Sequence, residues 1–102
     1  MILGDLLPAA ATTAILYSAN VGLGAVGTVY FVNQSAIVDQ VQLAITLSSN
    51  AMPSNNSYIM YNAPVVSNYT VAVPDIALGQ NQGLYVYSEN GTTSFTYIGS
   101  TL

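Results

Sequence analysis

The side chains of this sequence that could carry out acid–base chemistry are four carboxylates, Asp5, Asp39, Asp75 and Glu89. The sequence contains no His, Cys, Lys, Arg or Trp, so an imidazole base, a thiolate, a Schiff-base amine and the usual zinc ligands are all missing. A glycosidase needs two carboxyl groups on either side of a sugar-sized groove, and the spacing of these four does not indicate such a pair. We therefore expect a protein that is not an enzyme, whose carboxylates serve in turns and caps.

A calcium site would need several oxygen ligands that converge on one point, and Asp39, Asp75 and loop amides could supply them. The sequence has neither an EF-hand loop nor a repeated glycine–aspartate motif. We expect no metal and no cofactor.

Tyrosine is the other chemically distinctive residue, with eight copies in the chain. Tyr side chains beside Asn- and Ser-rich loops are typical of adaptable contact surfaces and of surfaces that bind carbohydrate. The pairs Tyr58–Tyr61 and Tyr85–Tyr87 are the candidates for such surface contacts. The alternative is that strand tyrosines pack their rings and expose only the hydroxyl at the rim of a sheet.

Charge is scarce throughout the sequence. Only 4% of the 102 residues are charged while 52% are apolar, and the net charge is −4, whereas a soluble domain usually has about 25% charged residues. With no cation to neutralise phosphates, binding to nucleic acid is not expected. So neutral a surface favours a protein whose native state is an assembly, in which copies of itself or other proteins cover much of the surface. The alternative is a monomer kept in solution by its hydroxyl groups.

Residues 6–38 form an uncharged run that could suggest a membrane span or a pilin-type helix. Pro8 and Gly22, Gly24 and Gly27 interrupt the run, and no Lys or Arg precedes it as a signal peptide would require. The apolar residues after Gly24 are β-branched or aromatic, which favours strands. We expect no association with a membrane.

Hydrophobic residues alternate with polar ones along most of the chain, and this pattern predicts β-strands. The clearest alternation is in residues 39–47, and residues 25–34 place Val26, Thr28, Tyr30 and Val32 on one face. The predicted strands cover residues 13–18, 25–34, 39–47, 58–63, a part of 65–74, 84–88 and 94–99.

Turns are expected between these strands, at residues 20–24, 35–37, 48–57 and 78–83. Asn90–Gly91 is the strongest hairpin signal, because both residues tolerate the positive φ of a type I′ turn. Pro64 and Pro74 flank one strand and place it at a sheet edge or interrupt it there.

Seven or eight short antiparallel strands separated by such turns predict an all-β fold, a β-sandwich or jelly-roll. We expect the sandwich domain over residues 11–102 and an extended N-terminal arm over residues 1–10. The apolar side chains of this arm have no evident partner within the chain and are candidates for insertion into a neighbouring subunit. They are Ile2, Leu3, Leu6 and Leu7.

Four Asn residues begin an N-x-S/T triplet, the acceptor pattern for N-glycosylation. A chain this rich in Asn, Ser and Thr contains such triplets by composition, so we do not expect them to be modified. They are Asn33, Asn55, Asn68 and Asn90.

Four segments resemble a family of small virion proteins of tailed phages: TTAILYSA (12–19), TVYFVNQSAIVDQVQLAIT (28–46), PSNNSYIMYNAPV (53–65) and GLYVYSENGTTSFTYIG (83–99). The family pattern has an opening T…LY strand, a strand ending in a Cys/Asn–Asn/Arg dipeptide, and V.V.LA.S, YI.Y and VYVYS strands. Asn33–Gln34 stands at the position of the dipeptide, and residues 41–45, 58–61 and 85–88 stand at the positions of the last three strands. The family also has Arg and several acidic residues where this chain has Gln, Thr or Asn, so no site is carried over.

The resemblance implies a structural protein of the virion with a β-sandwich fold, often trimeric. The expected role is capsid decoration: a cement protein on the capsid exterior that bridges neighbouring major capsid subunits. One alternative is an accessory module of the tail, baseplate or fibre that binds a receptor or glycan. Another is an extracellular filament subunit, which as a pilin would contain a substantial helix.

Overall fold

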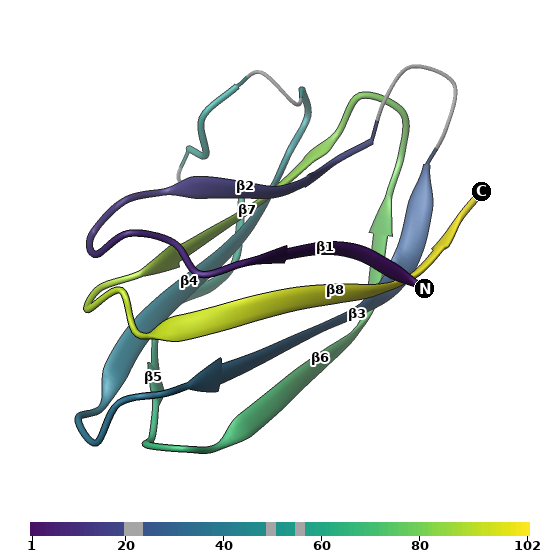
Figure 1. The fold of residues 1–102 in the computed structure, drawn as a ribbon. Coiled ribbons are helices and arrows are strands. Elements are labelled where there is room, and N and C mark those ends of the chain that lie inside the picture. The colour runs from purple at the N-terminus through teal and green to yellow at the C-terminus, as the bar shows by residue number, and fades with distance from the viewer. Residues whose placement is uncertain (20–23, 49–50, 55–56) are drawn as a thin grey trace.

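The structure is a computed structural model that describes residues 1–19, 24–48, 51–54 and 57–102. All regular structure in the described residues is β (Figure 1). The eight strands are β1 (Ile2–Leu6), β2 (Ala14–Ser18), β3 (Ala25–Asn33), β4 (Asp39–Thr46), β5 (Tyr58–Val65), β6 (Thr70–Leu78), β7 (Gly83–Ser88) and β8 (Thr93–Thr101).

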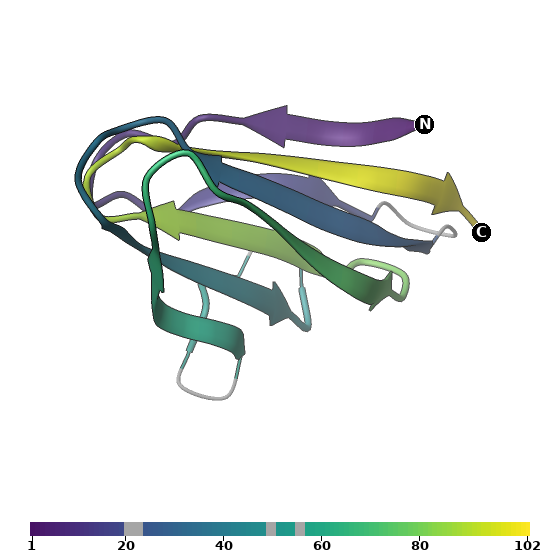
Figure 2. The same cartoon turned by 90° about the horizontal axis from the view of Figure 1, so that it is seen from below.

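The strands form two four-stranded sheets, which lie one over the other in Figure 2. The strand order is β1-β8-β3-β6 in sheet A and β2-β7-β4-β5 in sheet B. The antiparallel pairs β1·β8, β2·β7, β3·β6 and β4·β5 are nested, so the first half of the chain pairs with the second half in reverse order. Nested pairing across two sheets is the jelly-roll form of the β-sandwich, and the predicted all-β fold class is confirmed.

The core lies between the two sheets and is built from the inward-facing residue of each alternating pair. From sheet A, Val29, Phe31 and Phe95 are almost fully buried, and the rings of Phe31 and Phe95 lie 5.5 Å apart. Sheet B contributes Val41 and Leu43, which are also buried. The alternation that predicted these strands therefore reports which side chains face the core.

The predicted strands agree with the observed ones to within about two residues at most ends. Both prolines lie in edge strands, as predicted, but they do not flank a single strand. Pro64 is in β5 and Pro74 is in β6, and these strands are the outer edges of sheets B and A. An edge strand tolerates proline because the missing N–H can face away from the ladder.

The N-terminal segment differs from the prediction of an extended arm. Residues 2–6 form the edge strand β1, which pairs with β8 of the same sheet, and Leu3 and Leu6 pack against the core. The segment therefore belongs to the sandwich and does not extend away from it. The sequence analysis missed this strand because its backbone partner is more than ninety positions away in the chain, as in the pair Ile2 and Ile98.

The predicted hairpin at Asn90–Gly91 is also wrong. Gly91 has a positive φ of 71°, as expected for this turn residue, but β7 and β8 belong to different sheets and do not pair. The turn instead carries the chain from one sheet to the other. Most of the turn expected at 20–24, parts of the loop at 48–57 and the triplet that begins at Asn55 lie outside the described residues.

Within the ranges that the structure describes, no helix is long and apolar enough to cross a bilayer. Those ranges contain no helix of any length, so the helix that a pilin-type filament subunit requires is not found there.

Candidate functional site

Asp39 is fully buried at the start of β4 and accepts hydrogen bonds from both sheets. Its Oδ2 accepts from the hydroxyl of Ser88 and, at 2.6 Å, from Thr93 Oγ1. Its Oδ1 accepts from the backbone N–H groups of Asn90 and Gln40, each at 2.9 Å. Since Thr93 lies in β8 of sheet A and Ser88 in β7 of sheet B, the carboxylate connects the two layers.

This network also explains the turn at 89–92. The N–H groups of Thr92 and Thr93 donate to Ser88 Oγ at 3.2 and 3.3 Å. Side-chain acceptors therefore satisfy backbone donors that a hairpin ladder would otherwise pair. Burial would raise the pKa of Asp39, but the four hydrogen bonds outweigh it and hold the pKa below the ordinary value of 3.8. Asp39 is thus a charged structural anchor.

Asn33 makes a second connection between the sheets at the end of β3. Its Nδ2 donates to the carbonyl oxygens of Ile37 at 2.7 Å and of Val65, in β5 of sheet B, at 3.0 Å. Its Oδ1 accepts from the N–H of Ser35 at 3.0 Å and from Thr92 Oγ1 at 2.9 Å. The side chain is fully buried and its hydrogen-bonding groups are used within the fold.

The four carboxylates lie at different places in the fold, and only Asp39 is buried. Nowhere in the residues with described positions do three or more His, Cys, Asp or Glu side chains gather so that they could hold a metal ion. Asp5 is exposed on β1, Asp75 is exposed on β6 with a positive φ of 62°, and Glu89 is exposed in the turn after β7.

The structure does bring together the four tyrosines that the sequence singled out. Tyr85 lies between Leu84 and Val86, which both face the core, so its own side chain points out of sheet B. Ala44 of β4 is the register partner of Tyr85 on one side and of Tyr58 on the other. A row of Tyr58, Ala44 and Tyr85 therefore crosses the outer surface of sheet B.

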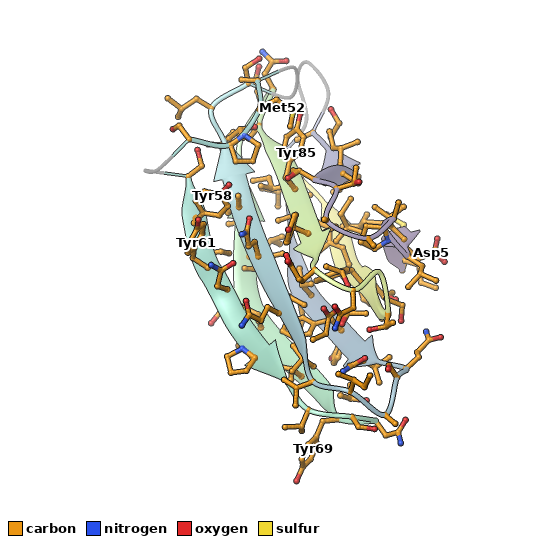
Figure 3. The ribbon with its side chains drawn as sticks, turned by 90° about the vertical axis from the view of Figure 1, so that its left-hand side faces the viewer. Asp5, Met52, Tyr58, Tyr61, Tyr69 and Tyr85 are labelled. Carbon is orange, nitrogen blue, oxygen red and sulfur yellow. The ribbon has the colours of Figure 1, made fainter. Side chains whose placement is uncertain are left out.

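The remaining members of this surface surround the row. Tyr61 contacts Tyr58 edge-on, with ring centroids 4.8 Å apart and planes at 72°. Tyr87 is two residues beyond Tyr85 and is the register partner of Gln42, which in turn donates to Asn62 Oδ1 across 2.8 Å. We call this surface the tyrosine face, and Figure 3 shows its labelled residues Tyr58, Tyr61 and Tyr85. Its members are Gln42, Ala44, Tyr58, Tyr61, Asn62, Tyr85 and Tyr87.

Glu89 borders the tyrosine face next to Tyr87. The Tyr87 hydroxyl donates to the Glu89 carboxylate. This hydrogen bond, followed by partial burial and by the charge of Glu89, raises the pKa of Tyr87 above its ordinary value of 10.0. The Tyr87 phenol therefore stays protonated as a donor over the whole physiological range.

The other tyrosines lie elsewhere. Tyr97 is buried in the core, 5.6 Å from the ring of Tyr17, and its hydroxyl donates to the Ile76 carbonyl at 2.8 Å. Burial, and then the proximity of Tyr17, raise the pKa of Tyr97 to about 12. Tyr30 lies on the outer surface of sheet A, and Tyr69 lies in the connection before β6, well away from the tyrosine face in Figure 3.

The outer surface of sheet A has a different character. Ile2 and Ile98 are opposite one another in β1 and β8, while Val26 and Tyr30 project from β3. Each of these side chains is exposed, from 37% for Val26 to 62% for Ile2. We call these residues the aliphatic face. In the described chain the strands of sheet A contain two charged residues, Asp5 in β1 and Asp75 in β6, and both are exposed.

The structure separates the four apolar residues predicted to insert into a neighbour. Leu3 and Leu6 are partly buried against the core, while Ile2 and Leu7 are 62% and 54% exposed. Only the last two are therefore free to contact another molecule without loss of the β1 packing.

Sequence reasoning missed several residues of these sites. Asn33 was interpreted as the start of a compositional N-x-S triplet, but its side chain is buried and connects the two sheets. Asn68, which begins another triplet, is exposed. The Asn90 side-chain amide donates to the Val38 carbonyl at 3.2 Å. Gln42 and Ala44 could have been assigned to the tyrosine face from the strand alternation of residues 39–47. Asn62 could not, because its positive φ of 51° marks an irregularity in β5 that no local pattern predicts.

Comparison with known proteins gives no relative for this chain: no family model, no curated protein and no solved structure matches it.

Proposed function

We propose that this chain is a non-enzymatic structural protein of a phage virion that decorates the capsid exterior. In this role it binds across the boundary between neighbouring major capsid subunits and stabilises the shell. Support comes from the resemblance of its strand sequences to small virion proteins and from the chemistry of its surface.

The observation that carries the proposal is the aliphatic face. Ile2, Val26, Tyr30 and Ile98 are exposed together on one side of a four-stranded sheet. Exposed apolar side chains that cluster in this way mark protein-binding surfaces. The sequence has no Lys or Arg, so no cationic side chain must lose its hydration when this face is covered.

The energetics of a repeated shell suit such a surface. A stable protein interface buries about 1,200–2,000 Å² in total, about half of it on each partner. A trimer of this chain that contacts several capsid subunits would add the contacts of its copies, so a modest affinity for each site gives a high avidity.

The jelly-roll topology agrees with the proposal by analogy of fold alone, since this fold is common in viral capsid proteins and in lectins. Within the N-terminal segment, the contact with a neighbour is assigned to Ile2 and Leu7, because Leu3 and Leu6 already pack within the chain.

Quantitative mass spectrometry of purified virions tests the proposal. Hundreds of copies per particle are expected for a capsid decoration protein. A few dozen copies or fewer would instead favour the tail, baseplate or fibre alternative, and absence from particles would overturn the virion role.

A matched pair of variants tests the aliphatic face itself. Ile98→Ser is expected to lower the number of copies per particle and the temperature at which the shell opens. Ile59→Ser is the control, because Ile59 is a similarly exposed isoleucine on β5 of the other sheet. Equal incorporation of both variants would contradict the assignment of this face to the capsid.

A further inference from the structure

Ala44 and Tyr85 are buried outside the core, which is unusual for residues on an outer sheet surface. Ala44 is 1% exposed and Tyr85 is 7% exposed, yet neither belongs to the cluster of buried residues between the sheets. Ala44 points outward because its neighbours Leu43 and Ile45 pack toward the core. Neighbouring atoms therefore cover the centre of the tyrosine face, where these two residues lie.

Exposed aromatic and amide groups surround Ala44 and Tyr85. Tyr61 is 63% exposed, and its ring lies edge-on against the ring of Tyr58. Gln42 and Asn62 are joined by one hydrogen bond, which uses only part of the two donors and two lone pairs that each amide has. The tyrosine face thus combines aromatic rings with amide groups that can still donate and accept hydrogen bonds.

The negative charge near the tyrosine face restricts the ligands that can bind there. The charged group that borders the face is Glu89, held by the Tyr87 hydroxyl. The chain has no Lys, Arg or His, and its net charge is −4. An anionic ligand, such as a uronic acid or a sulfated sugar, would be repelled by this field. A carboxylate can however accept hydrogen bonds from the hydroxyl groups of a neutral ligand.

We infer that the tyrosine face binds a neutral oligosaccharide. A sugar ring has an apolar C–H surface that can stack on the rings of Tyr61 and Tyr58, and hydroxyl groups that pair with Gln42, Asn62 and Glu89. Ligand sites combine apolar contact area with a few convergent polar groups in this manner. The aliphatic face, which lacks such amides, is the more suitable surface for protein contact.

The inference does not depend on the proposed capsid role, because it concerns the opposite sheet. Its test uses the purified full chain labelled with ¹⁵N and a fixed set of probes. The neutral probes are cellohexaose, xylohexaose, mannohexaose and maltohexaose, and the anionic probe is hexagalacturonate. We expect saturable chemical-shift changes with at least one neutral probe, and no such changes with hexagalacturonate.

Two tyrosine variants serve as a matched pair. Tyr61→Ala is expected to weaken binding of the responding probe at least tenfold. Tyr69→Ala should change it less than twofold, since Tyr69 is 65% exposed and Tyr61 is 63% exposed but the two lie on different parts of the surface. Because both side chains are exposed, neither change should alter the fold, and ¹⁵N spectra of the free variants check this.

Three outcomes would overturn the inference: no saturable response to any neutral probe, equal weakening by both variants, or preference for hexagalacturonate. If Tyr61→Ala abolished self-association of the chain without changing glycan binding, the face would be an interface between copies instead. Incorporation into virions is measured separately with Ile98→Ser, so failure of one hypothesis leaves the other testable.

Discussion

Thr93 in β8 donates a hydrogen bond to Asp39 in β4 across 2.6 Å, and this contact joins the two sheets at one end of the sandwich. Fifty-four residues separate the two in the chain. Asn33 and the Val65 carbonyl make the second such contact, at 3.0 Å. Every buried side-chain nitrogen and oxygen in the described ranges has a partner, so these polar groups fix how the layers meet without leaving an unsatisfied group.

Asp39→Asn tests the first of these anchors. In this variant the NH₂ group of the Asn side chain would face hydrogen-bond donors that the Asp39 carboxylate now accepts from. Each buried donor left without an acceptor costs about 1–3 kcal/mol. We expect the free energy of unfolding, measured by urea titration, to fall by about 2–4 kcal/mol. Asp5→Asn is the control, because Asp5 is exposed, and surface changes of this kind are usually within about 0.5 kcal/mol. Equal effects of the two would refute the role of Asp39.

The depressed pKa of Asp39 also predicts a dependence of stability on pH. The pKa of this group is below 3.8 in the folded state, so between the two pKa values the unfolded chain binds more protons and stability increases with pH. The contribution of Asp39 is fully present above the unfolded pKa and is lost as pH falls through the folded pKa. Urea midpoints measured from pH 6 down to pH 2 should therefore fall more steeply for the natural chain than for Asp39→Asn. Parallel curves for the two proteins would contradict this assignment.

Asn33→Asp tests the second anchor with almost no change in shape. The Nδ2 group donates to two backbone carbonyls, Ile37 and Val65, and an aspartate would present oxygen to both. We expect a loss of about 3 kcal/mol, since two buried acceptors lose their donor and a charge is buried beside them. Asn68→Asp, at an exposed site, is the control. If both variants unfolded at the same urea concentration, the Asn33 contacts would be unimportant for stability.

The hydrogen bond between Tyr87 and Glu89 can be tested through the titration of the phenol. The pKa of Tyr87 is raised chiefly because its hydroxyl donates to Glu89. In Glu89→Gln this charged acceptor is lost, so the pKa of Tyr87 should decrease toward 10.0, as measured by NMR of ¹³Cζ-labelled tyrosine. The pKa of Tyr97, raised to about 12 by burial, should not change and is the internal reference. An unaltered Tyr87 pKa would mean that the contact does not persist in solution.

The parts of the fold that depend on local pattern could be predicted from sequence. Alternation over residues 39–47 gave the strand β4 and the faces of Val41, Leu43 and Gln42, and the prolines marked the edge strands. The arrangement of strands into sheets could not be obtained in this way. β1 was missed because the strand that stabilises it, β8, is distant in the chain. The Asn90–Gly91 dipeptide indicated a hairpin because a local signal contains no information on Asp39, whose side chain accepts a hydrogen bond from the Asn90 N–H.

The candidate site shows the same division. The sequence singled out four tyrosines as two pairs of near neighbours in the chain. Only the register of β4 with β5 and β7 shows that all four lie on one surface. Composition indicated a neutral contact surface. Only the pairing of the strands shows that the aliphatic face lies on sheet A and that the tyrosine face lies on sheet B.

Gly27 and Gly99 face one another in the pairing of β3 with β8, and the close approach of the strands there leaves no room for a side chain. A Cβ on Gly27 would lie 2.2 Å from the Ile98 carbonyl oxygen, which is far inside van der Waals contact and involves backbone that cannot rotate away. Forcing such overlap costs about 1–3 kcal/mol or more, so Gly27→Ala should lower the thermal midpoint and unfolding free energy by that amount. Gly79→Ala is the matched control, because its nearest contact is the flexible Gln82 Oε1 at 3.3 Å. A Gly27→Ala variant as stable as Gly79→Ala would show that β3 and β8 are farther apart than described, and would remove the geometric basis for the position of Ile98 on the aliphatic face.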